Sequence, residues 1–505
     1  MHISELMDLN ARRFPDKDFV RINGKGYTYS TIKDFSEKAA GFFKTCGIGK
    51  GDKIAIMSFN TAGFVIGFHA TAKTGATLVP VNHKLTHQEV DYILEHSEAK
   101  LFLFDGALKD VADNLSCSIK KVSLESRVDG YEHFEDELEK AEPFTLQEFS
   151  DLDIAQILYT SGTTGNPKGC LHTHRSVIAA GIGMGWALKF DDDDRILMAM
   201  PIWHSSPLNN WFVGIQIVGG TMVMLREYHP LHFLQTIQEE KCTAFFGAPI
   251  ALIMPVQMIP NFDEFDLSSM RVFMYGGGPI PAEVIPKLME KYKSKNFYQC
   301  YGMTESGPTG SISYPKHQLV KLGSIGTGGA PGGDLKVMKN NDEEALPGEV
   351  GEIWLKGDSI MQEYYKDPDA TANVLQDGWY KTGDVALLDE DRFLFIQDRK
   401  KDMIITGGEN VYSKEVEDAI GSHPDVMEVA VIGIPHPEWG ETVGAVIVPN
   451  QGADLTSEEI KSYISDKLAK YKIPRFIEFA EDLPHTPTGK IKKFELREAH
   501  SKAFN

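Results

Sequence analysis

The sequence predicts an α/β fold in two parts: a large N-terminal domain with parallel-rich sheets covered by helices, and a small C-terminal α+β domain. Three observations predict it. Short apolar runs recur along most of the chain and alternate with amphipathic stretches, which is the pattern of strands buried under helices on both faces of a sheet. Near residue 400 this pattern gives way to a compact series of helices and strands. A chain of 505 residues is also too long for one compact domain.

The predicted strands of the large domain are short apolar runs separated by helical patterns such as His87–His96. These runs are Lys53–Phe59, Ala76–Val81, Lys100–Phe104, Ile154–Tyr159, Ile196–Met200, Thr221–Leu225, Thr243–Phe246 and Val272–Tyr275. In the small domain we expect helix Ser413–Ile420, strands Glu428–Ile434 and Thr442–Val448, helix Ser457–Ala469 and strand Phe476–Phe479.

A short charged stretch, Asp398–Asp402, marks the predicted domain boundary. We place the large domain at residues 1–399, a hinge at Lys400–Lys401 and the small domain at residues 402–505. The alternative is an ordinary charged surface turn inside one large domain.

Composition excludes several classes of protein. The formal charge of −21 disfavours nucleic acid and anionic lipid as partners, although a local nest of backbone N–H groups can still bind an anion. Five cysteines without a CxxC pair argue against a disulfide framework or a zinc site and fit a reducing cytoplasm. The N-terminal segment has no apolar core typical of a signal peptide, and no run reaches ~18 apolar residues, so we expect a cytoplasmic protein without a signal peptide or membrane insertion.

The most informative segment is the loop Tyr159–Gly169, which reads YTSGTTGNPKG and follows a predicted strand. Its hydroxyls can donate hydrogen bonds to phosphate oxygens, its glycines allow close backbone approach, and Lys168 adds a positive charge. Because Gly169 follows Lys168, the loop is not a Walker A motif. The alternative is a flexible polar loop. The expected phosphate contacts are Thr160, Ser161, Gly162, Thr163, Thr164, Gly165 and Lys168.

This loop resembles the signature of the adenylate-forming superfamily, which includes acyl-CoA synthetases, peptide-synthetase adenylation domains and beetle luciferases. Further segments resemble the superfamily's motifs in the expected order: Pro201–His204, Tyr275–Pro279, Tyr301–Glu305, Gly378–Asp384, Asp398–Tyr412 and Pro487–Lys490. The resemblance covers nearly the whole chain and is closest to the acyl-CoA synthetase type. It implies an ATP-dependent carboxylic acid–CoA ligase, which forms an acyl-adenylate with release of pyrophosphate and then transfers the acyl group to the thiol of CoA.

The resemblance also implies residue roles in the nucleotide site. Tyr301 would stack on adenine, Thr304 would hydrogen-bond the α-phosphate, and Glu305 would help to hold Mg²⁺, a hard cation that prefers oxygen ligands. Asp384 and Arg399 would contact the ribose. The remaining expected nucleotide contacts are Gly277, Gly278, Pro279, Gly302 and Met303.

Lys490 is the expected catalytic lysine of the small domain. By the resemblance it reaches the carboxylate and the α-phosphate during adenylation, where its charge would stabilise the transition state. The small domain then rotates about Lys401, and Lys490 vacates the site for the CoA thiol. Gly407 and Gly408 would let the pantetheine arm pass, and Asn410 would reorganise around the adenylate.

The resemblance places His204 as a gate between the acyl pocket and the CoA tunnel, without a role in proton transfer. With Asn209 and Asn210 nearby, the expected acyl pocket is more polar than a long alkyl tail would require. A fatty, aryl or related organic acid is favoured, and a polar acid such as a carnitine-like betaine stays open. Segment Ala244–Phe246 lacks the Asp with which adenylation domains grip an amino acid. The expected pocket residues are Trp203, Ser205, Ser206, Phe246, Cys300 and Gly307.

Three other functions stay open on this sequence: an adenylation enzyme that loads a carrier-protein thiol, a luciferase-like oxidative activity, and a catalytically inactive nucleotide-binding regulator. Intact Lys490, Thr304 and Glu305 count against the last of these. The acidic run Asp191–Asp194 lacks calcium-loop spacing and is expected to be a solvated turn. The oligomeric state is left open, a homodimer included.

Overall fold

The computed structural model describes residues 1–160, 167–278, 280, 284–339, 343–406, 409–437, 439–485 and 491–504. They divide into two compact units. Residues 1–160, 167–336 and 354–381 form the larger unit, and the described residues of 337–353 and 382–505 form the smaller one. Each unit has hydrophobic clusters of its own.

The first sheet of the larger unit contains β1 (Asp18–Ile22), β2 (Lys25–Thr28), β10 (Arg195–Met198), β11 (Thr221–Met224), β12 (Ala244–Gly247), β13 (Val272–Gly276), β14 (Phe297–Tyr301) and β15 (Ser311–Ser313). Its order is β15-β14-β13-β12-β10-β11-β1-β2. Neighbours from β14 to β1 are parallel, and β15 and β2 are antiparallel additions at the edges. The carboxyl ends of the parallel strands therefore share one edge of the sheet.

The second sheet of the larger unit contains β3 (Lys53–Met57), β4 (Thr77–Val81), β5 (Ala99–Asp105), β6 (Lys120–Leu124), β7 (Glu132–His133), β8 (Ile154–Thr160), β9 (Lys168–Thr173) and β18 (Glu363–Tyr364). Its order is β18-β9-β8-β4-β3-β5-β6-β7. Strands β7 to β8 are parallel, whereas β9 runs antiparallel to both β8 and β18. A strand from far along the chain, β18, thus lies directly beside the strand that begins at Lys168.

Burial on both faces explains why the central strands read as continuous apolar runs. Ile54 and Ile56 of β3 enter one hydrophobic cluster, and Ala55 and Met57, which point the other way, enter another. All four side chains are fully buried. An apolar residue is therefore favoured at every position of the strand, rather than at every second one.

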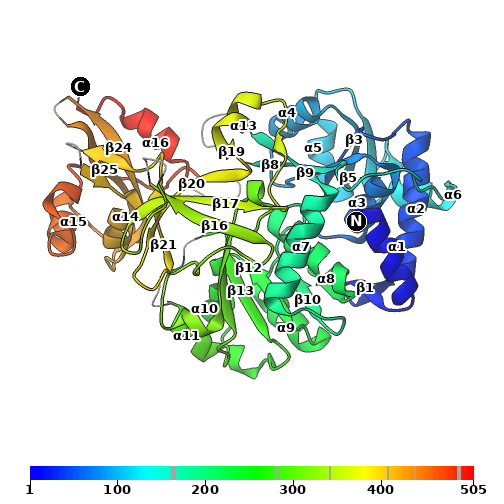
Figure 1. The fold of residues 1–505 in the computed structure, drawn as a ribbon, viewed down its shortest axis with the longest axis horizontal. Coiled ribbons are helices and arrows are strands. Elements are labelled where there is room, and N and C mark those ends of the chain that lie inside the picture. The colour runs from blue at the N-terminus through cyan, green and yellow to red at the C-terminus, as the bar shows by residue number, and fades with distance from the viewer. Residues whose placement is uncertain are drawn as a thin grey trace. The chain divides into compact units, whose positions relative to one another are not determined.

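The larger unit's helices begin and end at recognisable signals; α4, for example, starts with a capping box of Thr86 and Glu89. The α-helices are α1 (Ile3–Arg13), α2 (Tyr29–Thr45), α3 (Ala62–Thr74), α4 (His87–Ser97), α5 (Lys109–Asp113), α6 (Phe134–Lys140), α7 (His174–Leu188), α8 (Val213–Val218), α9 (Pro230–Glu240), α10 (Pro249–Met258), α11 (Val284–Lys291), α12 (Pro315–Gln318) and α13 (Pro368–Val374). Shorter turns are η1 (Gly106–Leu108), the π-helix η2 (Ser206–Phe212), η3 (Phe262–Glu264) and η4 (Thr304–Ser306). Helices α9, α10 and α11 pack beside β10, β12 and β13 (Figure 1).

A third sheet contains β16 (Gly333–Met338), β17 (Val350–Gly357), β19 (Leu375–Gln376), β20 (Trp379–Leu388) and β21 (Leu394–Arg399). Its order is β16-β17-β20-β19, and β21 pairs antiparallel with β20. This sheet was not expected from the sequence. Its strands are partly exposed, as the outer half of β16 shows, and therefore lack the continuous apolar runs of the first two sheets.

The smaller unit contains a fourth sheet with β22 (Ile404–Thr406), β23 (Glu409–Val411), β24 (Val426–His436), β25 (Gly440–Pro449) and β26 (Phe476–Phe479). Its helices are α14 (Ser413–Gly421), α15 (Ser457–Ile464), α16 (Lys493–His500) and the short η5 (Lys470–Lys472). Alternate residues of β24 enter two clusters: Val431 packs with α14 and α15, and Ile432 packs with α16. The long hairpin of β24 and β25 is therefore covered on both faces.

The predicted α/β class, with parallel-rich sheets and a small C-terminal α+β domain, is confirmed. The expected strands and helices are present, with ends shifted by a few residues. Helix α15 ends at Ile464 instead of Ala469, where serine and aspartate, both weak helix formers, follow. The boundaries at residues 399 and 402 stay predictions. In the part of the chain that the structure describes, no helix has the length and apolarity to span a membrane.

Candidate functional site

The pair Thr304–Glu305 stands on a rigid turn directly after β14. Gly302 is required there, because a Cβ at this position would lie 2.3 Å from the carbonyl oxygen of Pro308. The buried Ser306 hydroxyl accepts a hydrogen bond from the Met303 amide at 3.1 Å and donates to the Met303 carbonyl at 2.9 Å. The two side chains are thus presented from a fixed backbone.

Thr304 is held from two directions. Its hydroxyl lies 3.2 Å from the hydroxyl of Ser205, and its carbonyl oxygen lies 2.9 Å from Nε2 of His172 on β9. Burial lowers the pKa of His172 to about 4, so the ring is neutral near pH 7. Since a carbonyl can only accept, Nε2 carries the proton and donates it to Thr304.

Glu305 is oriented by one side chain. Its Oε1 accepts a hydrogen bond from the hydroxyl of Tyr364 at 2.9 Å, and its carbonyl accepts from the Met361 amide at 2.8 Å. Within the described ranges, Oε2 has no protein hydrogen bond. A half-buried carboxylate with one oxygen open fits a hard divalent cation that keeps part of its water shell.

Lys168, the first residue of β9, reaches the same place. Its Nζ lies 3.7 Å from a carboxylate oxygen of Asp367 and 5.1 Å from the ring centroid of Tyr364. Thr160 is its register partner on β8. The structure therefore brings Lys168 and Glu305 together around one tyrosine. The other expected phosphate contacts, Ser161, Gly162, Thr163, Thr164 and Gly165, lie outside the described residues.

The glycine segment after β13 is open on one side. Gly277 has a left-handed φ of 76°, and a Cβ at Gly277 or Gly278 would meet no atom within 4 Å. The parallel neighbour of β13 is β14, and its last residue, Tyr301, is half-buried. These residues end adjacent strands and so share one sheet edge. Pro279 lies outside the described residues.

Two expected ribose contacts meet in the smaller unit. Asp384 on β20 and Arg399 on β21 are register partners, and Nε of Arg399 lies 3.0 Å from Oδ1 of the buried Asp384. Lys401 and Asn410 are exposed. Gly407, Gly408 and Lys490 lie outside the described residues, and the nearby His485 and Ile491 form an antiparallel bridge.

The expected acyl-pocket residues are uncharged. Phe246 is buried and stacks on Trp211, with centroids 5.6 Å apart and an interplanar angle of 15°. Ser205 and Ser206 are buried at the start of the π-helix. Burial raises the pKa of the Cys300 thiol to about 12, which keeps it protonated and unreactive.

Trp203 and His204 differ in exposure. The indole Nε1 of the half-buried Trp203 donates to Nδ1 of His83 at 2.9 Å, whereas His204 is exposed beside it. His204 is therefore not packed in the core, although that is the usual environment of a histidine next to a tryptophan.

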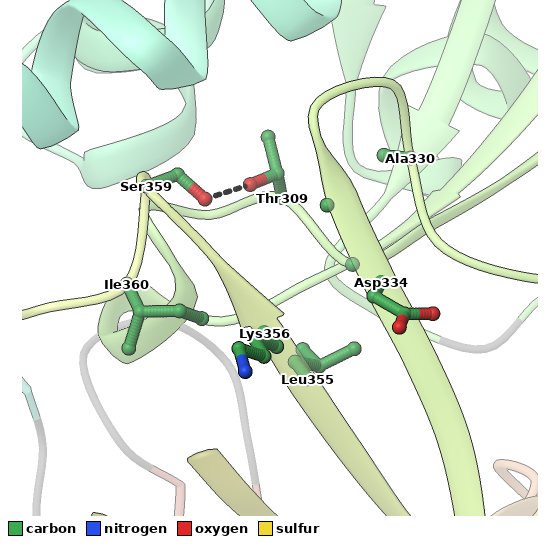
Figure 2. A pocket seen from close by; sticks show the side chains of 9 residues that line it. Thr309, Ala330, Asp334, Leu355, Lys356, Ser359 and Ile360 are labelled. Atoms are coloured by element: carbon green, nitrogen blue, oxygen red, sulfur yellow. Dashed lines mark hydrogen bonds between the residues drawn. The ribbon is translucent and has the colours of Figure 1, made fainter. Parts of the chain in front are cut away.

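Gly307 is required by close backbone packing. Its φ is 77°, and a Cβ would lie 2.1 Å from the carbonyl oxygen of Ser359. The small pocket beside it has a volume of about 10 Å³, room for about one water molecule and not for an acyl group. Figure 2 shows the hydroxyls of Thr309 and Ser359 pointing toward one another, 2.5 Å apart. The pocket is lined by Thr309, Gly310, Ala330, Gly333, Asp334, Leu355, Lys356, Ser359 and Ile360.

The side-chain amides of Asn209 and Asn210 each make a hydrogen bond within the protein. Asn209 accepts a hydrogen bond from Gln156 at 2.8 Å, and Asn210 donates to the carbonyl of Pro308 at 3.3 Å. They add less polarity to an acyl pocket than the sequence suggests.

The solvated-turn prediction for Asp191–Asp194 is wrong at its last residue. Asp194 is buried and accepts hydrogen bonds from the Arg271 guanidinium at 2.8 Å and from Thr243 at 2.6 Å. Asp194 and Arg271 therefore form a structural ion pair. The other three aspartates are exposed, as expected.

Sequence reasoning missed Tyr364 and His172. Both act through partners far along the chain: His172 and Thr304 are 132 positions apart, and Tyr364 and Glu305 are 59 apart. Neither lies in a motif with characteristic spacing. Only the pairing of β9 with β18 could have pointed to Tyr364.

Comparison with known proteins now identifies the family. Residues 7–365 match the family model of the AMP-binding enzyme, and residues 415–490 match that of the AMP-binding enzyme C-terminal domain. The chain belongs to the AMP-binding enzyme family. The superfamily resemblance of the sequence motifs is thereby confirmed.

Relatives of this AMP-binding enzyme match along almost their whole length. A long-chain-fatty-acid–CoA ligase of Mycobacterium tuberculosis is 35% identical, with 94% of this chain and 93% of the relative covered. A feruloyl-CoA synthase of an Amycolatopsis species is 33% identical, with 96% of each covered. The o-succinylbenzoate–CoA synthetase of Bacillus subtilis, solved with its acyl-adenylate intermediate, superposes with a TM-score of 0.87 at 28% identity and 97% coverage of each chain. This AMP-binding enzyme is accordingly an AMP-forming acid–CoA ligase with ATP and CoA as co-substrates.

Proposed function

We propose that this ligase activates a fatty or aryl acid, and that Lys168, Thr304 and Glu305 form the phosphate side of its adenylation site. The observation that carries the proposal is the convergence of Lys168 and Glu305 on Tyr364, beside the fixed Thr304. These side chains supply a cation, a hydroxyl donor and a carboxylate at one place.

In the first half-reaction a carboxylate oxygen attacks the α-phosphorus of ATP, the new C(=O)O–P bond forms, and pyrophosphate leaves with the electron pair of the broken P–O bond. Lys168 offsets phosphate charge, and the Thr304 hydroxyl donates to the α-phosphate. Bound at Glu305, Mg²⁺ would neutralise charge between the approaching anions. Tyr301 stacks on adenine, and Asp384 with Arg399 holds the ribose. Lys490 supplies the second cation.

In the second half-reaction the CoA thiol attacks the acyl carbonyl, and AMP leaves. We propose that the small domain, residues 402–505, turns about Lys401 between the two steps and withdraws Lys490. Gly407, Gly408 and Asn410 then face the pantetheine arm. His204 suits a gate because its ring is exposed beside the anchored Trp203.

The proposed acid class rests on the pocket side chains. The stacked pair Phe246 and Trp211 offers an apolar aromatic wall, and the expected lining contains no carboxylate to hold a quaternary or primary amine. A fatty or aryl tail therefore fits better than a betaine. The named substrates of two relatives, a long-chain fatty acid and ferulate, belong to these two classes.

A pyrophosphate-release screen over fatty, aryl, amino and betaine acids, run with and without CoA, tests the proposal. We expect release with fatty or aryl acids and thioester formation with CoA alone. Release confined to amino acids or betaines, or a requirement for a carrier protein, would overturn it. The proposed cytoplasmic location, which rests on the cysteine usage, is tested separately by cell fractionation.

A further inference from the structure

Tyr364 lies at the centre of three contacts in the larger unit. Its hydroxyl donates to Oε1 of Glu305 at 2.9 Å, its ring faces the ammonium of Lys168 at 5.1 Å, and its oxygen accepts a hydrogen bond from the hydroxyl of Tyr380. The two groups proposed to bind the nucleotide phosphates and their cation thus share one support.

Strand pairing fixes the position of this support. Tyr364 is the register partner of Cys170 on β9, two residues after Lys168, and its amide donates to the Thr371 hydroxyl at 3.0 Å. The side chain packs against Cys170, Met361 and Tyr380 in a small hydrophobic cluster. Because the ring is buried, burial raises the pKa of Tyr364 far above its ordinary value, and the hydroxyl remains a donor.

We propose that Tyr364 is a positioning residue for adenylation, which orients Glu305 toward the metal–nucleotide through its hydroxyl and Lys168 toward the phosphates through its ring. The inference rests on the roles proposed above for Glu305 and Lys168. Tyr364 itself touches neither substrate nor metal in this account. It acts by fixing Oε1, which leaves Oε2 as the open ligand.

The hydroxyl and the ring have separable effects. Without the hydroxyl, the Glu305 carboxylate is free to rotate, and cation binding must then pay the entropy of ordering it. Without the ring, Lys168 loses a cation–π contact and its flexible stem loses a packing surface. Tyr364→Phe removes the hydroxyl and keeps the ring, whereas Tyr364→Leu removes both.

A matched control is the next residue along the chain. Tyr365 donates its hydroxyl to Glu98 at 3.0 Å, away from Glu305. Tyr365→Phe therefore removes one tyrosine hydroxyl with one carboxylate partner, as Tyr364→Phe does, and leaves the proposed phosphate side unchanged.

The test measures binding in the full-length enzyme by calorimetry. The probe is α,β-methylene-ATP, which cannot be adenylated, with Mn²⁺ titrated in one arm and EDTA present in the other. For Tyr364→Phe we expect the Mn²⁺ dissociation constant to rise by roughly tenfold, the cost of ordering one freed glutamate side chain, with metal-free nucleotide affinity unchanged. Tyr364→Leu should weaken metal-free nucleotide binding as well. Tyr365→Phe should change neither.

Unchanged Mn²⁺ affinity in Tyr364→Phe would overturn the proposal, and so would an equal loss of metal-free nucleotide binding in that variant. Glu305→Gln separates this outcome from failure of the proposed function: unchanged Mn²⁺ affinity there refutes the role of Glu305 itself. The double variant adds a check against misfolding. If Tyr364 acts through Glu305, Tyr364→Phe should cost nothing further in the Glu305→Gln background, and a fully additive loss contradicts the proposal.

Discussion

Replacing His172 with phenylalanine removes a buried donor from beneath the catalytic turn and, at the same time, a buried titrating group. The ring of His172 is completely enclosed, and its Nε2 donates to the Thr304 carbonyl at 2.9 Å. The Thr304 carbonyl also accepts a hydrogen bond from the Gly307 amide at 3.1 Å, so the variant removes one of its two hydrogen bonds, which is worth about 0.5–1.5 kcal/mol. We expect His172→Phe to destabilise the larger unit by this amount at pH 7.5 and to slow adenylation through displacement of Thr304.

Lowering the pH has the opposite effect on the stability difference, because it destabilises the wild type through His172 but not the variant. The pKa of His172 is about 4 in the folded enzyme and about 6.5 in the unfolded chain, so the unfolded chain binds the proton first as pH falls. In the wild type, the contribution of His172 to stability is present above pH 6.5, falls as the pH drops below that value, and stops changing below about pH 4. Between pH 7.5 and 5.5 the wild type therefore loses about 1 kcal/mol through His172, a loss that His172→Phe does not share.

Urea unfolding followed by tryptophan fluorescence at pH 7.5 and 5.5 measures both effects. His172→Gln is the matched control, because its amide can donate to Thr304 but does not titrate. We expect it to recover most of the stability and activity at pH 7.5 and to share the weaker pH dependence. A His172→Phe variant as stable as wild type at pH 7.5, or one with an undiminished pH dependence, would contradict the role of His172 as a buried neutral donor.

Three further predictions follow from single contacts. His69 is fully buried with both ring nitrogens unpartnered among the described residues, so His69→Leu should raise the free energy of unfolding, measured in urea, by about 1–2 kcal/mol; a lower value would contradict this. Gly307→Ala places a Cβ 2.1 Å from the Ser359 carbonyl at a φ of 77°, so it should cost about 1–3 kcal/mol and lower the melting temperature; an unchanged melting temperature would count against it. Lys401→Pro should spare pyrophosphate release and impair thioester formation from added acyl-adenylate, and equal loss of both steps would refute the hinge.

Local sequence patterns predicted the parts of the enzyme that depend on neighbouring residues. Strand β3 was predictable because burial on both faces leaves an unbroken apolar run. Lys168 was expected at a phosphate site from its loop and Glu305 from the family resemblance, and their roles stay proposals. Asp384 and Arg399 were expected only from the family resemblance, and the hairpin that pairs them was not predicted.

The remaining features depend on contacts that no local pattern encodes. Tyr364 reaches Glu305 only because β18 adds to β9, a pairing between distant segments. His172 resembles any core histidine in sequence, although it holds Thr304. The third sheet was missed since its strands alternate weakly in burial, and the single buried aspartate of an acidic run, Asp194, owes its place to Arg271.

Transfer of oxygen from the acid to AMP distinguishes an acyl-adenylate from other activated acids. An acid substrate labelled with ¹⁸O in its carboxylate is converted with ATP and CoA, and the products are analysed by mass spectrometry. Attack of the carboxylate on the α-phosphorus requires one ¹⁸O in AMP and none in pyrophosphate. Label in inorganic phosphate or pyrophosphate, with unlabelled AMP, would contradict an acyl-adenylate intermediate.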